Sequence, residues 1–443
     1  MPTPETLHQW DFDHVWHPFT QATEWEDAGE PLIIEKAEGC VLIDVHGKTY
    51  LDGISSLWTN VHGHRHPLIN AALRDQMDRV AHTTMLGQAG VPSIVLAKRL
   101  SDLLARIEGA ESPLTRTFYS DSGSTAVEVA LKMAFQYQQQ VGETQRCRFA
   151  ALSEAYHGDT IGSVSVGGID LFHQIYRPLL FDAVRIPAPD HPIEKEEEAC
   201  LRVARQRFAQ HGHEIAALVV EPLVQGAAGM RMHSVAYLRE IIAMARDAGA
   251  LVICDEVAVG FGRTGTMFAM EQVGTRPDII CLAKGISGGY LPLAATVVND
   301  TIYDAFRAPY DEHKTLFHGH TYTGNALCCA AALANLDVFE SEQVIASLPK
   351  RIDALSQALA SLPQQYIGEI RQKGMMAAAV LRHDQPPSAR VGHMVAMAAR
   401  SHGVVVRPLG DSIIFMPPLA MTPEQIAQLG RSVAGAITDV LGQ

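Results

Sequence analysis

Between residues 115 and 299, short apolar runs alternate with longer segments whose composition favours helices. The apolar runs fall at residues 116–119, 217–221, 250–255 and 278–283. Such alternation is typical of βα units, in which helices connect parallel strands and cover the sheet. The sequence therefore predicts an α/β fold with a mostly parallel central sheet flanked by helices.

The two ends of the chain have a different pattern. Strand-like pieces at residues 32–35, 40–44, 404–407 and 412–416 stand among long helical stretches. A chain of 443 residues is also too long for one simple core, so a second lobe is expected. We therefore expect a small α+β domain built from residues 1–65 and 336–443, beside a large domain of residues 66–335.

Charged side chains stand where three of the predicted strands end. Glu221, Asp255 and Lys284 each close an apolar run, and ligand sites in such sheets lie beyond the carboxyl ends of the strands. A partly desolvated lysine has a lowered pKa and becomes nucleophilic, so Lys284 could form a Schiff base. Such a lysine, with an aspartate facing a pyridinium nitrogen, is what proteins contribute to pyridoxal 5′-phosphate (PLP) chemistry. Taken alone, a strand-end lysine more often extends its ammonium group into solvent.

Residues 120–128 follow a predicted strand and open a predicted helix. Gly123 permits a tight turn, and the free amides of a helix start, with the hydroxyls of Ser124 and Thr125, suit a phosphate group. The spacing of Thr125 and Glu128 predicts a capping box at the start of the helix. An ordinary capped helix without a ligand is the alternative interpretation.

An aromatic pair, Tyr156 and His157, precedes Gly158, a residue that would let a ligand approach the backbone. A flat cofactor ring could lie on either side chain of the pair. A polar turn is the alternative interpretation.

The pattern Gly-x-Gly-x-x-Gly at residues 260–265 also occurs in nicotinamide-binding proteins. No clear helix opens after it, and no acidic residue ends a strand about twenty residues later, so a dinucleotide site is not expected. We expect instead a glycine-rich turn that holds Arg263 near the site.

Composition argues against several other kinds of partner. The net charge is −14 and no long basic block occurs, which argues against nucleic acid and anionic membrane surfaces. Neither a secretory signal nor an apolar run long enough to cross a bilayer is expected. Seven cysteines without a Cys-x-x-Cys pair indicate reduced thiols in a cytoplasm. No metal is expected, because His62, His64 and His66 have no cysteine or carboxylate nearby in the sequence.

Together these motifs resemble the class III, fold type I aminotransferases over essentially the whole chain. The resembling stretches are residues 14–20, 55–58, 62–64, 121–124, 156–160, 221–226, 255–257, 260–265, 284, 319–325 and 407–410. The Trp-His-Pro, Ser-Ser-x-Trp and Arg-Pro-x-Gly elements point to one branch of this family. That branch aminates 8-amino-7-oxononanoate to 7,8-diaminononanoate in biotin biosynthesis.

The resemblance implies PLP as cofactor, with a role for each motif. Lys284 would hold PLP covalently and move protons, Asp255 would keep the pyridine nitrogen protonated, and Glu221 would lie nearby. Val257 would pack on one face of the ring, with Tyr156 or His157 on the other. The expected phosphate ligands are Gly123, Ser124 and Thr125, joined by Thr321 from a second subunit. His320 is also expected among the cofactor-binding residues. The active site would thus be shared across a homodimer.

The resemblance also implies a substrate slot and leaves the amino donor open. The residues expected to contact substrate are Phe19, Trp58, Tyr156, Lys284, Gly319 and Arg407, with Arg407 binding the remote carboxylate. Phe19 stands where many of these enzymes have tyrosine, and His320 stands where proline is frequent. The branch that takes lysine as donor shares both features, so the donor could be L-lysine rather than S-adenosylmethionine.

Three other functions remain as alternatives at this stage. The nearest is another class III ω-aminotransferase that acts on ornithine, 4-aminobutyrate or β-alanine, against which Trp58 and the segment 407–410 argue. A nicotinamide dehydrogenase would use the glycines of residues 260–265. A non-catalytic binding protein would not require both Lys284 and Asp255.

Overall fold

The computed structural model describes residues 2–27 and 31–442. Its largest sheet has seven strands, in the order β4, β12, β11, β10, β7, β5 and β6. Their bounds are β4 (Leu114–Ser120), β5 (Arg148–Leu152), β6 (Ala183–Ile186), β7 (Ile215–Val220), β10 (Leu251–Asp255), β11 (Ile279–Leu282) and β12 (Ala294–Asn299). All neighbours pair in parallel except β12, which is antiparallel to β11 and to β4. The predicted mostly parallel central sheet is therefore confirmed.

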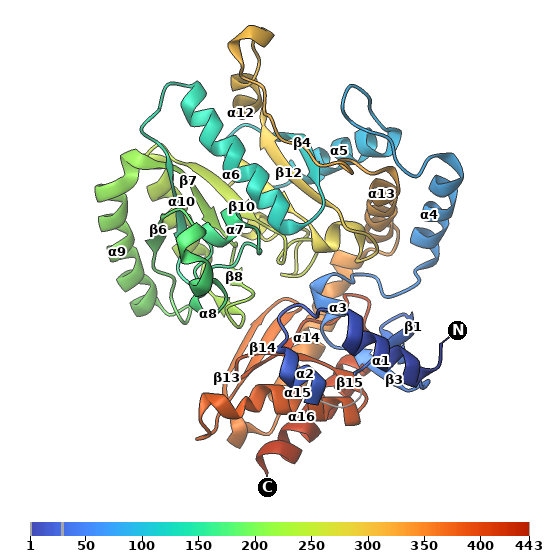
Figure 1. The fold of residues 1–443 in the computed structure, drawn as a ribbon. Coiled ribbons are helices and arrows are strands. Elements are labelled where there is room, and N and C mark those ends of the chain that lie inside the picture. Colours follow the sequence, from blue (N-terminus) through green and yellow to red (C-terminus); the bar gives the residue numbers. More distant parts are fainter. Residues whose placement is uncertain (1, 28–30, 443) are drawn as a thin grey trace.

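Helices cover both faces of this sheet (Figure 1). α6 (Gly123–Gln140) packs on one face, where Ala126 and Ala130 share a hydrophobic cluster with Ile253 of β10. α5 (Val91–Leu104), α9 (Glu194–His211), α10 (Val235–Asp247) and α13 (Ala326–Ser341) contribute to the cluster that contains Val252. Adjacent residues of β10 therefore face opposite clusters, which explains why the whole run is apolar.

The two terminal regions of the chain share a smaller lobe, in the lower part of Figure 1. One sheet has the order β1 (Ile34–Glu38), β2 (Val41–Asp44), β3 (Thr49–Asp52) and β15 (Val404–Val405), and β3 pairs with β15 in parallel. The other has the order β13 (Ile367–Lys373), β14 (Met376–Leu381), β17 (Ser412–Phe415) and β16 (Arg407–Leu409).

The domain boundaries at 65/66 and 335/336 stay predictions. α13 runs without interruption across the second of these positions. Residues 1, 28–30 and 443 of the predicted small domain lie outside the described residues.

The remaining elements connect or cover these sheets. The helices are α1 (Pro4–His14), α2 (Ala22–Asp27), α3 (Ser55–Trp58), α4 (Pro67–Arg79), α7 (Ile161–Val166), α8 (Asp170–His173), α11 (Met270–Val273), α12 (Asp300–Ala305), α14 (Val344–Ala360), α15 (Val391–Ser401) and α16 (Pro423–Leu441). Short 3₁₀ helices are η1 (Gln174–Leu179), η2 (Gly212–Glu214), η3 (Lys284–Ser287), η4 (Tyr310–Glu312), η5 (Gln364–Tyr366) and η6 (Pro387–Ala389), and β8 (Val224–Gln225) pairs with β9 (Arg231–Met232). Within the ranges that the structure describes, no helix is long and apolar enough to cross a membrane.

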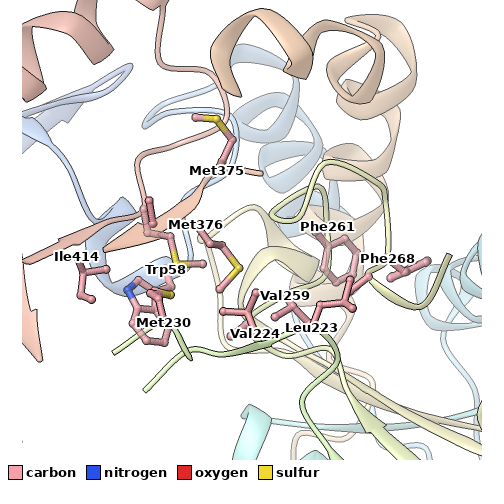
Figure 2. Close-up of a cluster of buried hydrophobic side chains, with 14 of the residues drawn as sticks. Trp58, Leu223, Val224, Met230, Val259, Phe261, Phe268, Met375, Met376 and Ile414 are labelled. Atoms are coloured by element: carbon pink, nitrogen blue, oxygen red, sulfur yellow. The ribbon is translucent and has the colours of Figure 1, made fainter. Parts of the chain in front are cut away.

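A buried cluster joins the smaller lobe to the loops that follow β7 and β10 (Figure 2). Met376 and Ile414 come from the smaller lobe, and Leu223 and Val259 come from the loops. Trp58 belongs to the same cluster and is only 9% exposed. The loops that follow β7 and β10 are therefore held against the smaller lobe by apolar burial.

Candidate active site

Lys284 lies two residues after the last residue of β11 and begins the 3₁₀ helix η3. Its backbone has φ = 46°, a left-handed conformation that residues other than glycine rarely adopt. Its Nζ atom lies 5.2 Å from the centre of the Trp58 ring. Burial lowers the pKa of the Lys284 ammonium, and the charge of Arg263 acts in the same direction. A lysine in this setting loses its proton more easily than one in water.

The carboxylate of Asp255 is fixed by two hydrogen bonds at the end of β10. His157 donates through Nδ1 to Oδ2 at 2.8 Å, and the Val257 amide donates to Oδ1 at 3.0 Å. Both Asp255 and His157 are buried, at 4% and 3% exposed. The His157 Nε2 atom is buried and has no hydrogen-bond partner within the described parts of the chain. Buried polar atoms are nearly always hydrogen-bonded, so this nitrogen indicates that a polar group of a ligand binds beside it.

Glu221 follows β7 and holds the backbone around the aromatic pair. Its oxygens accept hydrogen bonds from the amides of Tyr156 and Gly226, each at 3.1 Å. Burial raises the pKa of its carboxyl to about 7, and the Asp255 charge adds to the rise. The Tyr156 hydroxyl donates to Asp159 at 2.7 Å, and burial raises its pKa.

The start of α6 forms a cradle beside these groups. Ser122 is the N-cap: its hydroxyl accepts from the Thr125 amide at 3.3 Å, and the Thr125 hydroxyl accepts from the Ser122 amide at 3.0 Å. The capping box predicted for Thr125 and Glu128 is therefore wrong by three residues. Glu128 instead accepts hydrogen bonds from the amides of Gly162 and Ser163 at 2.7 and 3.2 Å.

The cradle depends on two glycines. A Cβ atom on Gly123 would lie 2.5 Å from the Val257 side chain, and one on Gly158 would lie 2.3 Å from Ser124. Gly158 also has φ = +111°, which other residues rarely adopt. The Ser124 hydroxyl in turn accepts from the Thr160 amide at 3.0 Å. Backbone thus approaches closely here, as a phosphate site at a helix start requires.

These groups surround one cavity of about 440 Å³. Nine of the residues expected at the site line it: Trp58, Gly123, Ser124, Tyr156, His157, Glu221, Asp255, Val257 and Lys284. Thr125 does not line the cavity, since its hydroxyl caps α6. Sequence reasoning missed Ser122, Asp159 and Thr160, which also contribute to the wall.

Phe19 and Arg407 line a second cavity of about 330 Å³. Phe172, which lines neither cavity, contacts one wall residue of each: its ring lies 5.4 Å from the Phe19 ring and 6.2 Å from the Tyr156 ring, centre to centre. Arg390, His393 and Arg400 also line this second cavity and were not expected from the sequence. Their basic side chains could have indicated a site for an anion, but no local sequence pattern indicates that they share a cavity.

Gly319, His320 and Thr321 line neither cavity. They lie between η4 and α13, where the His320 Nδ1 atom contacts Asp121 at 2.5 Å. The Thr321 carbonyl accepts a hydrogen bond from His82 at 3.0 Å, and Thr321 is exposed. Within one chain, these three residues are therefore separate from the Lys284 cavity.

Arg263, expected near the site, is buried, at 2% exposed, and does not line the cavity. Its guanidinium donates to the carbonyls of Asn60 and Pro417 at 2.9 and 2.6 Å. Burial lowers its pKa to about 10. Its hydrogen bonds join the segment after α3 to the segment before α16. Among residues 2–27 and 31–442, no group of three or more His, Cys, Asp or Glu residues could hold a metal ion.

The residues of the first cavity fit PLP. The cavity presents a lysine of lowered pKa, a fixed carboxylate, a glycine-lined helix start and a buried imidazole nitrogen without a partner. The lysine can react with the carbonyl carbon of PLP, the carboxylate can pair with its pyridine nitrogen, and the helix start can bind its phosphate.

Comparisons with known proteins agree with this chemistry. Residues 23–437 match the model of the class-III aminotransferase family. The chain is 54% identical to the adenosylmethionine-8-amino-7-oxononanoate aminotransferase of Nitratidesulfovibrio vulgaris, over 98% of this chain and 82% of that protein. It is 47% identical to the Geobacter sulfurreducens protein of the same name, over 99% of this chain and 98% of that one.

Solved structures give the same result. The crystal structure of the Methanocaldococcus jannaschii protein of that name superposes with a TM-score of 0.92 at 39% identity, over 99% of both chains. A PLP-bound amine transaminase from an uncultivated Pseudomonas species superposes with a TM-score of 0.89 at 34% identity, over 96% of this chain and 99% of that one. The nicotinamide dehydrogenase and the non-catalytic binding protein are thereby excluded. The chain belongs to the class-III aminotransferases.

Proposed function

We propose that this aminotransferase uses PLP to aminate 8-amino-7-oxononanoate to 7,8-diaminononanoate in biotin biosynthesis. The observation that carries the proposal is the pair of cavities whose wall residues Tyr156 and Phe19 pack against the same ring, that of Phe172. One cavity contains Lys284, and the other contains Arg407. A long oxo-amino acid needs its reacting carbon near the lysine and its carboxylate at a remote cation, because binding there positions the carbon. The names of the relatives support this choice of acceptor.

PLP, when bound, supplies the electron sink and carries the amino group between the two substrates. Lys284 would hold it, and its Nζ atom, with a lowered pKa, would take the proton from the donor carbon and return it. Asp255, fixed by His157 and the Val257 amide, would hold a proton on the pyridine nitrogen. Val257 would pack on the ring, and Glu221 would keep the Tyr156 segment in place.

The phosphate would be bound at the start of α6 by Gly123 and Ser124, with the helix dipole favouring its charge. Thr125, whose amide and hydroxyl are bonded to Ser122, would hold the turn in shape for it. Trp58 and Tyr156 would line the slot for the substrate chain, and Phe19 would close its far end. Tyr156 or His157 would cover the ring face opposite Val257. Sequestering the reacting carbon in this way excludes water from the proton transfers.

A homodimer would complete each site. Gly319, His320 and Thr321 are separate from the cavity of their own chain, so a second subunit would bring them to it. The exposed apolar side chains Leu86, Phe317 and Tyr322, at 89%, 67% and 62%, fit a surface that a second copy covers. The five buried cysteines fit a reducing cytoplasm as the place of the reaction.

The amino donor would be L-lysine rather than S-adenosylmethionine. Phe19 presents an apolar ring at the second cavity where a tyrosine would present a hydroxyl, and it lies against Phe172. Loss of that hydroxyl removes a polar contact for a donor of the adenosyl type. An ω-aminotransferase acting on ornithine, 4-aminobutyrate or β-alanine is the second candidate.

A spectrophotometric half-reaction tests the proposal. PLP-loaded enzyme is mixed separately with 7,8-diaminononanoate, L-lysine, S-adenosylmethionine and 4-aminobutyrate, and the absorbance of the bound cofactor is followed. Bleaching by 7,8-diaminononanoate and by lysine is the expected result. Bleaching by 4-aminobutyrate but not by 7,8-diaminononanoate would replace the proposal with the second candidate. Bleaching by S-adenosylmethionine alone among the donors would refute the choice of lysine.

The variant Arg407→Met separates acceptor recognition from the chemistry. We expect KM for 8-amino-7-oxononanoate to rise by roughly 10²-fold, since a charge-assisted pair is lost. The variant Arg307→Met, which removes an exposed arginine paired with Asp304, serves as a matched control.

A further inference from the structure

Two histidines outside the cavity form a continuous hydrogen-bonded row. Lys132 of α6 contacts the His318 Nδ1 atom at 3.1 Å, and His318 Nε2 contacts His320 Nε2 at 3.1 Å. His320 Nδ1 contacts Asp121 Oδ2 at 2.5 Å. The row starts on α6 and ends one residue before its N-cap, Ser122.

The chemistry of the two ends fixes every proton in this row. The Lys132 ammonium can only donate, so His318 Nδ1 accepts and the hydrogen of His318 is on Nε2. That hydrogen is donated to His320 Nε2, which leaves the hydrogen of His320 on Nδ1. His320 then donates to the Asp121 carboxylate, which can only accept. Both histidines are neutral, and each has one possible tautomer.

The row joins two segments that are 199 residues apart in the sequence. One is the turn from Asp121 to Thr125, which opens the cradle of the first cavity. The other is the segment 318–321, which carries Gly319 and Thr321. The His320 amide also donates to the Thr323 hydroxyl at 3.1 Å, so the backbone of this segment is held at the same point.

We infer that His318 is a positioning residue for cofactor binding, which acts through His320 and Asp121 to hold the phosphate cradle and the segment 318–321 in one arrangement. The inference rests on the proposed phosphate site at the start of α6. His318 touches neither cavity, so its effect on PLP would be indirect. The row holds the turn 121–125 and the segment 318–321 in a fixed relative position. In a dimer, the turn would bind the phosphate of its own subunit and the segment 318–321 would reach the site of the second subunit.

Protonation of His318 would break the row, because a second hydrogen on this ring would face the Lys132 ammonium. The charged and titratable groups around the row are Lys132 and Glu128 from α6, Asp121 from the turn, and Cys328 from α13. Burial, Lys132 and His320 all lower the pKa of His318, so the neutral row persists to lower pH.

The test measures PLP binding to the full-length protein, freed of cofactor, by absorbance titration at about pH 8, above the range in which histidine ordinarily takes up a proton. His318→Leu cannot accept from Lys132 or donate to His320. His318→Gln can do both, through its oxygen and its NH₂ group, and rescues the row. His313→Leu removes an exposed histidine five residues upstream, against Tyr310, and is the matched control.

For His318→Leu, we expect the PLP dissociation constant to rise about tenfold at pH 8, the scale of one hydrogen bond. His318→Gln and His313→Leu should bind PLP like wild type at pH 8. An unchanged constant for His318→Leu, or a glutamine variant as weak as the leucine variant, would each overturn the inference. No substrate is present, so the result is independent of the acceptor and the donor.

Discussion

Glu221 gives the protein a pH-dependent stability that the variant Glu221→Gln should lack. Its carboxyl is 4% exposed, and burial raises its pKa from 4.5 to about 7. Two backbone amides donate to it, from Tyr156 and Gly226, which limits the rise. Glutamine has nearly the same shape and can accept one of these hydrogen bonds, but it does not ionise.

The sign and the size follow from proton linkage. Because the folded-state pKa is raised, the protonated carboxyl favours the folded state. The contribution is complete below the unfolded-state value of 4.5 and is lost as pH rises through about 7. At about 1.36 kcal/mol for each pKa unit, the wild type loses about 3 kcal/mol over this window. In the glutamine variant, the NH₂ group that replaces one carboxylate oxygen changes the free energy of unfolding by the same amount at every pH. That variant therefore shows no loss of stability as the pH rises.

Urea unfolding at fixed protein concentration and saturating PLP measures the effect. The free energy of unfolding of Glu221→Gln, minus that of the wild type, should increase by roughly 2–3 kcal/mol from about pH 5 to about pH 8. Glu198→Gln, which removes an exposed carboxylate of α9 paired with Arg205, is the charge-matched control. A difference for Glu221→Gln that is the same at every pH would refute the reasoning, because only the pH-independent offset would then be present.

Four further substitutions test other parts of the site. Lys284→Ala should lower the rate of amino transfer by roughly 10²–10⁴-fold, the range of a lost acid–base group, as measured in single-turnover mixing. A rate of amino transfer equal to that of the wild type would exclude Lys284 from the proton transfers. Gly158→Ala places a Cβ atom 2.3 Å from Ser124, so it should lower the free energy of unfolding by about 1–3 kcal/mol in urea and weaken PLP binding. Ser122→Ala removes the N-cap of α6 and should cost about 1 kcal/mol in thermal unfolding, whereas Thr125→Ser, which retains the hydroxyl, should cost less.

The convergence of Glu221, Asp255 and Lys284 was predictable from the sequence for a simple reason. Each follows a run of residues that is buried on both sides, and such runs form central parallel strands. Parallel strands bring their carboxyl ends to one edge, so polar residues that end them meet there. Two local signals, apolar runs and their charged ends, were sufficient to place these groups on one cavity.

The start of α6 shows where local signals fail. Ser122 and Thr125 both suit an N-cap, and the choice depends on which residue takes an extended backbone. Ser122 does, at φ = −147° and ψ = 164°. Glu128, expected to complete a cap on Thr125, is instead used by the amides of Gly162 and Ser163, more than thirty residues away. Competition for a side chain by a distant backbone has no local sequence pattern.

The residues expected to select the substrates are brought together by contacts between distant parts of the sequence. Phe19 meets Phe172 across 153 positions of sequence, and Arg407 lies on the same cavity from near the other end of the chain. The residues themselves did not predict this meeting, and only the family resemblance gave these positions a role. The chemistry common to the family thus resides in strand ends that sequence patterns predict. Its choice of donor and acceptor resides where the two termini fold over the sheet, so a change of substrate can arise at Phe19 or Arg407 without any change at Lys284 or Asp255.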